Sequence, residues 1–152
     1  MGRAVIAVVP VIAVAAAAGV ILFWGGPVLE AHDVEVRLGV GSAAVFLTIH
    51  NHGLLGDCLT AVNVLEPRGL SAGLHQSVID EGGVMRMVKL DKICIGGLSE
   101  VKLAGIEEGG LHIMVLGGTH DVKELKIELV FESGRKILVH AVAGQGGEEH
   151  NH

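Results

Sequence analysis

Two side chains that could bind a soft metal ion interrupt a short apolar segment in the last third of the chain. His112 and Met114 lie within the sequence GGLHIMVLGG, residues 109–118. Alternate residues of a β-strand share one face, so the two side chains are expected to point the same way. Leu111, Ile113 and Val115, which alternate with them, would then occupy the opposite face. The pattern places an imidazole and a thioether together on one side of a strand.

A second group of such residues surrounds a predicted hairpin turn at 80–83, DEGG. His75 precedes this turn, and Met85 and Met87 follow it on the returning strand. A hairpin folded there would bring the face that carries both methionines within reach of His75. We therefore expect two histidines and two or three methionines to converge on one spot.

These residue types favour monovalent copper. Thioether sulfur is a soft, neutral ligand, poor for Mg²⁺, Ca²⁺ and Zn²⁺ and good for Cu(I), whereas imidazole suits copper in either oxidation state. Packing is the other interpretation, because methionine often fills gaps in an apolar core. Every methionine after Met1 lies near one of these histidines, which favours the metal interpretation.

The elements that must position these residues are predicted to be strands. Apolar and polar residues alternate over short segments, and glycine pairs separate the segments, as is typical of an all-β fold with many turns. No segment after residue 30 shows a helical period with caps. About nine short strands predict a β-sandwich or Greek-key barrel. The expected strands are 33–40, 43–51, 58–66, 74–79, 84–90, 99–104, 111–116, 124–132 and 135–143.

The N-terminal segment is a candidate for membrane insertion. Residues 4–24 carry no charge over a length that spans a bilayer as a helix, and the preceding Arg3 predicts that the following domain lies outside the cytoplasm. A cleaved signal peptide is the alternative. We therefore divide the chain into a signal peptide or transmembrane anchor plus linker (1–31), a copper-binding β-sandwich domain (32–143) and a disordered, histidine-containing tail (144–152).

Charge and motifs exclude other classes of function. The net charge is −6 and the basic residues are scattered, so nucleic-acid binding is not expected. The sequence contains no Gly-x-Ser-x-Gly elbow, no paired carboxylates and no phosphate-binding loop. We expect no catalytic residues, hence a protein that is not an enzyme.

The histidine and methionine segments resemble the PCu(A)C-type (DUF461) periplasmic copper chaperones. The resemblance extends over residues 34–142, and the family pattern is His-(Met)-x10-Met-x21-His-x-Met. His75 and Met87 have the family spacing, within LHQSVIDEGGVMRM, and GGLHIM resembles the second half of the pattern. AAVFLTIHNHG likewise resembles a strand of the family.

Two features depart from the family pattern. Gln76 occupies the optional methionine position, and 24 residues instead of 21 separate Met87 from His112. We expect the additional residues in the loop 104–110, where they would lengthen a turn. An insertion within a strand would instead shift the register and move the ligands to the other face.

The resemblance implies a cupredoxin-like Greek-key β-sandwich that binds one Cu(I). It implies four ligands and a supporting role for Met85; the ligands would be His75, Met87, His112 and Met114. It also implies delivery of copper to the dinuclear copper site of a haem-copper oxidase, through its copper-bearing subunit or its assembly factors. The competing hypothesis is a structural or adhesive cell-surface β-sandwich without metal, in which His112 and Met114 are core residues.

Two cysteines and several other histidines complete the candidates. Cys58 and Cys94 could form a disulfide in an oxidising compartment, or lie buried as small apolar side chains. His50 and His52 flank a strand end as exposed polar residues, with accessory metal binding as the alternative. We expect ordinary surface roles for His32, His120 and His140, and a solvated tail with some capacity for Cu(II) at His150 and His152.

Overall fold

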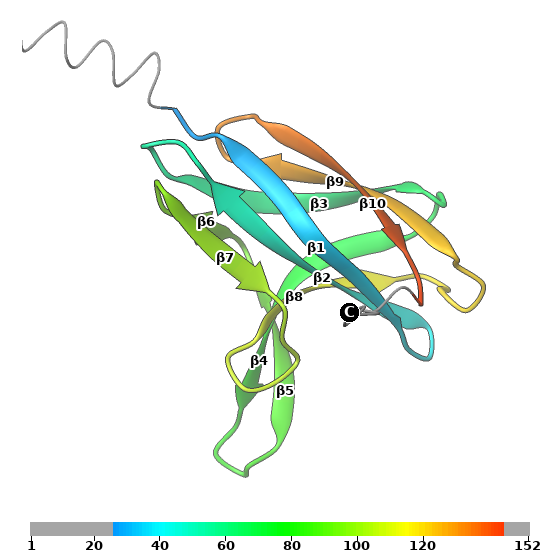
Figure 1. Ribbon diagram of the computed structural model, residues 1–152. Coiled ribbons are helices and arrows are strands. Elements are labelled where there is room, and N and C mark those ends of the chain that lie inside the picture. The colour runs from blue at the N-terminus through cyan, green and yellow to red at the C-terminus, as the bar shows by residue number, and fades with distance from the viewer. Residues whose placement is uncertain (1–25, 145–152) are drawn as a thin grey trace, which may run out of the picture.

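The computed structural model describes residues 26–144, which form a sandwich of two β-sheets. The strands cross one another in two layers, and one hairpin projects from the body (Figure 1). Ten strands are present: β1 (Leu29–Leu38), β2 (Ser42–Asn51), β3 (Asp57–Glu66), β4 (Ser71–Ile79), β5 (Met85–Leu90), β6 (Ile93–Ile95), β7 (Ser99–Leu103), β8 (Leu111–Leu116), β9 (Glu124–Phe131) and β10 (Lys136–Val142).

The larger sheet has the order β1-β2-β8-β4-β5, with β7 also paired to β2, and the smaller has the order β10-β9-β3-β6. All pairs between these strands are antiparallel. The predicted all-β sandwich is confirmed. The predicted transmembrane segment 4–24 and the tail from residue 145 lie outside the described residues. Within 26–144, no helix is long and apolar enough to cross a membrane.

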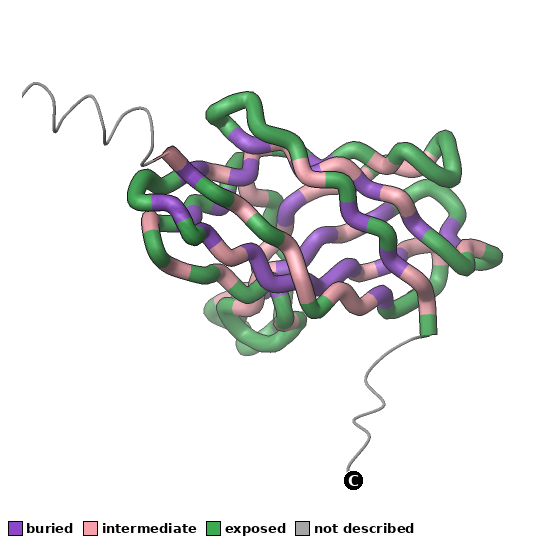
Figure 2. Tube along the Cα trace, turned by 45° about the horizontal axis from the view of Figure 1, so that its top comes forward, coloured by how far each residue is buried: buried purple, intermediate pink, exposed green. Residues whose placement is uncertain are grey.

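The core lies between the two sheets and follows from the alternation in the sequence. In β2, Val45, Leu47 and Ile49 point inward and are almost completely buried. They meet the inward-facing residues of β9, such as Ile127 and Leu129. Buried positions concentrate along the middle of the strands, and exposed positions concentrate at the turns (Figure 2). Burial of this branched aliphatic surface is the main force that holds the layers together.

The largest differences from the predicted strands concern β6 and the start of β1, while other strand ends differ by up to three residues. β6 was not predicted, because its three residues are too few to show an alternating pattern. Its isoleucines, Ile93 and Ile95, are buried beside β3. β1 begins at Leu29 rather than at Asp33, so the sheet includes residues predicted to be linker.

A β-bulge divides β1 into two halves. His32 pairs with Thr48 and Glu35 with Phe46, so β1 has one residue more than β2 over this interval. Asp33 takes up the difference in a left-handed conformation with φ of 54°. Aspartate tolerates this conformation better than most residues. As a result His32 and Glu35 both lie on the sheet face that points away from the core, whereas residues three positions apart in a regular strand would lie on opposite faces.

Cys58 and Cys94 form a disulfide between β3 and β6. The two residues are direct partners in the ladder of the smaller sheet. Of the two states that the sequence left open, the structure has the disulfide.

Candidate metal centre

The two predicted ligand segments lie side by side in the larger sheet. β8 is central, with β2 on one side and β4 on the other. His112 on β8 is the direct partner of His75 on β4, and Met114 is the direct partner of Gly73. Directly paired residues place their side chains on the same face of a sheet. The two imidazoles and the Met114 thioether therefore share the face that points away from the core.

Met87 belongs to the same face through the β4–β5 hairpin. It pairs with Ser77, and Lys89 pairs with His75, so Met87 lies one row farther along the sheet than the two histidines. Met85 pairs with Ile79, one row beyond that. This register agrees with the expectation that the hairpin places the strand face carrying Met85 and Met87 near His75.

Both methionines of the hairpin are accessible. Met85 and Met87 are each 47% exposed, because β5 is an edge strand with few neighbours on either face. The hairpin projects from the sandwich at its lower end in Figure 1. Any metal held by Met87 would thus lie near the surface, at the root of a projecting hairpin.

Backbone carbonyl groups determine which ring nitrogen of each histidine can bind a metal. Nδ1 of His75 lies 3.2 Å from the carbonyl oxygen of Gly73, and Nδ1 of His112 lies 3.1 Å from that of Gly105. A carbonyl oxygen only accepts, so Nδ1 must donate in both residues. In the neutral imidazole the lone pair is then on Nε2. Both rings carry their ligating atom at the same position.

His112 is the most deeply buried member of the group. It is fully buried, and its Nε2 has no hydrogen-bond partner among the described residues. Its ring centroid lies 6.1 Å from that of His75, with the planes inclined by 21°. A buried polar atom without a partner is unfavourable, and such atoms in native proteins often mark a functional site or an unseen ion. Ser77 Oγ, on the same face, is also buried and unpartnered.

Burial also controls the charge of His112. Burial lowers its pKa; the hydrogen bond to the Gly105 carbonyl opposes that shift, and the nearby His75 adds to it. The imidazole is therefore neutral at neutral pH, which is the state that can donate a lone pair to a metal.

The loop between β7 and β8, residues 104–110, covers His112. Two hydrogen bonds join it to Ser77 on β4, one from Gly109 N and one to Gly110 O. Gln76 Nε2 also donates to the Gly109 carbonyl. The residue at the family's optional methionine position thus anchors this loop.

The longer loop leaves the register of the sheet intact. The β4–β8 ladder runs without interruption from Ser71 opposite Leu116 to Gln76 opposite Leu111. His112 and Met114 consequently keep the face that the sequence pattern predicted for them.

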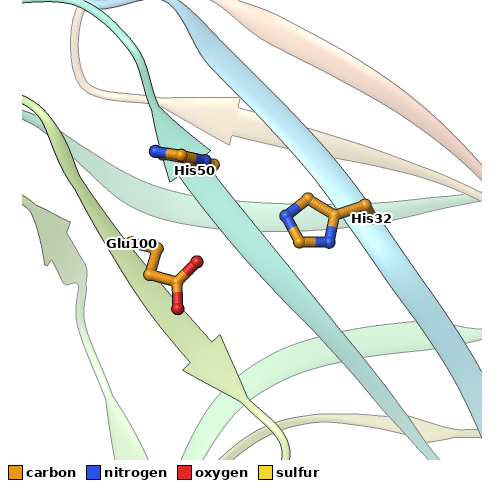
Figure 3. A group of neighbouring side chains, drawn as sticks. All are labelled: His32, His50 and Glu100. Carbon is orange, nitrogen blue, oxygen red and sulfur yellow. The ribbon is translucent and has the colours of Figure 1, made fainter.

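A second group of side chains was not recognised as a unit in the sequence. Ligand atoms of His32, His50 and Glu100 lie within 4.8 Å of one another on the same sheet face. They come from β1, β2 and β7, as Figure 3 shows. His32 was expected to have an ordinary surface role and Glu100 was not a candidate, because neither is close to His50 along the chain.

Comparison with known proteins defines the family. A family model described as "Putative lipoprotein LpqE-like" matches residues 29–143, so the chain belongs to the LpqE-like family. This confirms the predicted relationship to the PCu(A)C (DUF461) group. No curated protein sequence matches the chain significantly.

Solved structures confirm the cupredoxin-like β-sandwich. The chain is similar to "Apo PCuAC domain from PmoF1", with 22% identity, a TM-score of 0.59 and coverage of 78% of this chain and 94% of the other. It is also similar to "Copper-bound PCuAC domain from PmoF2", with 19% identity, a TM-score of 0.57 and coverage of 76% and 91%.

Proposed function

We propose that this protein is an extracytoplasmic carrier of Cu(I) that binds the ion through His75, Met87, His112 and Met114. One observation carries the proposal. The two paired histidines each donate Nδ1–H to a backbone carbonyl, which leaves both Nε2 lone pairs on the sheet face that also holds the two methionines. Membership of the family, and copper in a structure of similar fold, support the choice of metal.

The ligand set suits transfer of an ion rather than turnover of a substrate. Two neutral imidazoles and two thioethers favour Cu(I) over Cu(II), Zn²⁺ and Ca²⁺. Because none of the four proposed ligands is a thiolate or a carboxylate, copper can leave by ligand exchange without protonation of an anionic ligand. Met87 is the most accessible of the four and lies on an exposed edge strand, so we propose that an acceptor first approaches the ion there.

The carrier is proposed to work at the outer side of a membrane. The family description names a lipoprotein, and residues 4–24 are apolar and uncharged. Lipids attached to cysteine need a free thiol, whereas both cysteines of this chain are paired in the disulfide. We therefore propose attachment through residues 4–24. The proposed acceptor is the copper-bearing subunit of a haem-copper oxidase or one of its assembly factors.

A matched pair of methionine variants tests the proposed site. Met85 and Met87 share a strand, a sheet face and an exposure of 47%, and differ by one row in their distance from the histidines. Changes to residues that only support metal ligands typically weaken metal binding by about 10- to 100-fold. In competition with a Cu(I) chelator, Met87→Leu should weaken Cu(I) binding by at least this factor, since it removes a proposed ligand. Met85→Leu should change affinity little. Equal effects of the two variants, or no Cu(I) uptake by the wild type, would contradict the proposal.

Complete burial of His112 favours one competing function, a structural or adhesive domain without metal. Thermal unfolding with and without Cu(I) distinguishes the two. A ligand that binds the folded state raises the melting temperature, so copper should stabilise the wild type and stabilise Met87→Leu less. An unchanged melting temperature in stoichiometric Cu(I) would favour the structural role.

A further inference from the structure

We infer that His32, His50 and Glu100 form a second metal site, distinct from the histidine–methionine set, for a divalent ion that prefers imidazole, namely Zn²⁺ or Cu²⁺. One ligand atom from each residue lies within 4.8 Å of the others. Ligand atoms of a single ion at the usual metal–ligand distances of about 2.0–2.2 Å lie at most about 4.4 Å apart, so small rotations of these side chains bring the three atoms into range.

The register of the sheet explains why three distant residues meet. β2 lies between β1 and β7, and His50 on β2 is the direct partner of both Glu30 and Glu100. His32 lies in the next row, opposite Thr48. Figure 3 shows His32 and Glu100 on the two strands that flank β2, with His50 on β2 between them.

The β-bulge in β1 orients the His32 ring. Asp33, in its left-handed conformation, places a carboxylate oxygen 2.8 Å from Nδ1 of His32. A carboxylate accepts, so Nδ1 donates and Nε2 carries the lone pair in the neutral ring. A carboxylate behind the outer nitrogen of a metal-bound histidine is a recurrent arrangement that fixes the ring and raises its basicity. The bulge thus supplies a feature that points to a ligand independently of the cluster itself.

The donor atoms select the class of metal. Two imidazole nitrogens and one carboxylate oxygen suit Zn²⁺ and Cu²⁺, with Cu²⁺ favoured by the general order of affinities. Ca²⁺ needs six to eight oxygen ligands and is not expected here. Thioethers are absent from this group, so it is not a second Cu(I) site of the same kind. Further donors lie beside it, since Glu30 and His52 contact each other at 3.1 Å and the His52 ring lies 4.0 Å from that of His50.

The site is accessible from solvent. His32 and His50 are half-buried and Glu100 is exposed. Lys102 Nζ lies 3.6 Å from Glu100 Oε1, so the ion would compete with this ammonium group for the carboxylate. Exposed pairs of that kind contribute little free energy, and the lysine can leave readily.

Zn²⁺ binding distinguishes this site from the histidine–methionine set, because thioethers bind Zn²⁺ poorly. The test is a Zn²⁺ titration of the full chain followed by NMR of the histidine ring protons, in a background of His150→Ala and His152→Ala. We expect the resonances of His32 and His50 to shift first. Glu100→Gln, which keeps the shape of the side chain, should weaken Zn²⁺ binding by at least about tenfold, and His50→Ala should abolish it.

The chain offers a matched control for these variants. His140 Nε2 lies 3.2 Å from Glu124 Oε2 on the smaller sheet. This exposed pair belongs to no group of three metal-binding side chains within residues 26–144. His140→Ala should leave Zn²⁺ affinity unchanged. Equal affinity of Glu100→Gln and wild type, or first shifts at His75 and His112, would overturn the inference. Neither result bears on Cu(I) binding by the methionine variants, so this site and the proposed function fail separately.

Discussion

Backbone carbonyl groups prepare the two histidines of the proposed copper site. The carbonyl oxygens of Gly73 and Gly105 each accept a hydrogen bond from Nδ1 of one ring, which leaves Nε2 as the nitrogen that can bind a metal. Glycine at position 73 has a second effect. A Cβ atom there would lie 3.3 Å from Cε1 of His75, so glycine keeps space beside this ring and opposite Met114. These two residues act by positioning others and touch no metal themselves.

Asp80 is the residue whose charge shapes the hairpin that carries Met87. Its Oδ1 accepts from the amides of Gly82 and Val84 at 2.9 and 3.0 Å, and Oδ2 accepts from Arg86 Nε at 2.6 Å. The hydrogen bond from Val84, followed by that from Arg86, lowers the pKa of this carboxyl below its usual 3.8. The ionised carboxylate therefore stabilises the turn.

Acidification should open this turn at a low pH. Because the folded-state pKa is depressed, the stabilisation is complete above the ordinary value of 3.8 and is lost as the pH falls through the lower, folded-state value. The protection factors of the Gly82 and Val84 amides, which correct for the intrinsic pH dependence of exchange, should show this loss in the wild type as the pH decreases. Asp80→Asn should remove the pH dependence. A midpoint above 3.8, or the same pH dependence in the variant, would contradict the argument.

At the scale of elements, the loop 104–110 and the β4–β5 hairpin together build the surroundings of His112. The loop closes on itself where Gly105 and Gly110 approach each other. A Cβ atom on Gly110 would lie 2.6 Å from the carbonyl carbon of Gly105, which no real contact permits. In this loop the Gly105 carbonyl oxygen lies 3.1 Å from Nδ1 of His112.

Gly110→Ala should therefore weaken Cu(I) binding without removing a ligand. The new methyl group forces the loop to move, and His112 loses the carbonyl that holds its tautomer, so we expect a loss of about 10- to 100-fold in affinity. Glu108→Ala is the control, since this exposed side chain lies in the same loop. Chelator competition measures both variants. Unchanged affinity in Gly110→Ala would show that the loop does not position the ligand.

At the scale of the whole molecule, the two sheets have separate roles. The larger sheet carries both candidate metal groups on its outer face, and Phe46 lies on that face between them, with its ring centroid 6.4 Å from that of His112. The smaller sheet closes the core and contains the disulfide. Stability and metal binding should thus respond to different substitutions.

Removal of the disulfide tests this separation. The bridge joins residues 36 positions apart, and a loop of that length contributes about 3–4 kcal/mol in the chain-entropy model. Replacement of Cys58 and Cys94 by serine should lower the free energy of unfolding by that amount in urea denaturation. Cu(I) affinity of the folded variant should stay unchanged. Loss of copper binding by a folded variant would contradict the separation.

The sequence by itself determined most of the strand pattern and which of the proposed copper ligands share a face within each strand. Alternation has a period of two residues, so the segments around His75, Met87 and His112 predict both a strand and which residues of that strand share each face. Tertiary structure decided the rest. The pairing of His75 with His112, the β-bulge at Asp33 and the meeting of His32 with Glu100 depend on which strands become neighbours. Strand order depends on how the apolar surface of all strands is buried between the two sheets. The free energy of that burial comes from residues far apart in the sequence, so the alternation within one segment does not predict it.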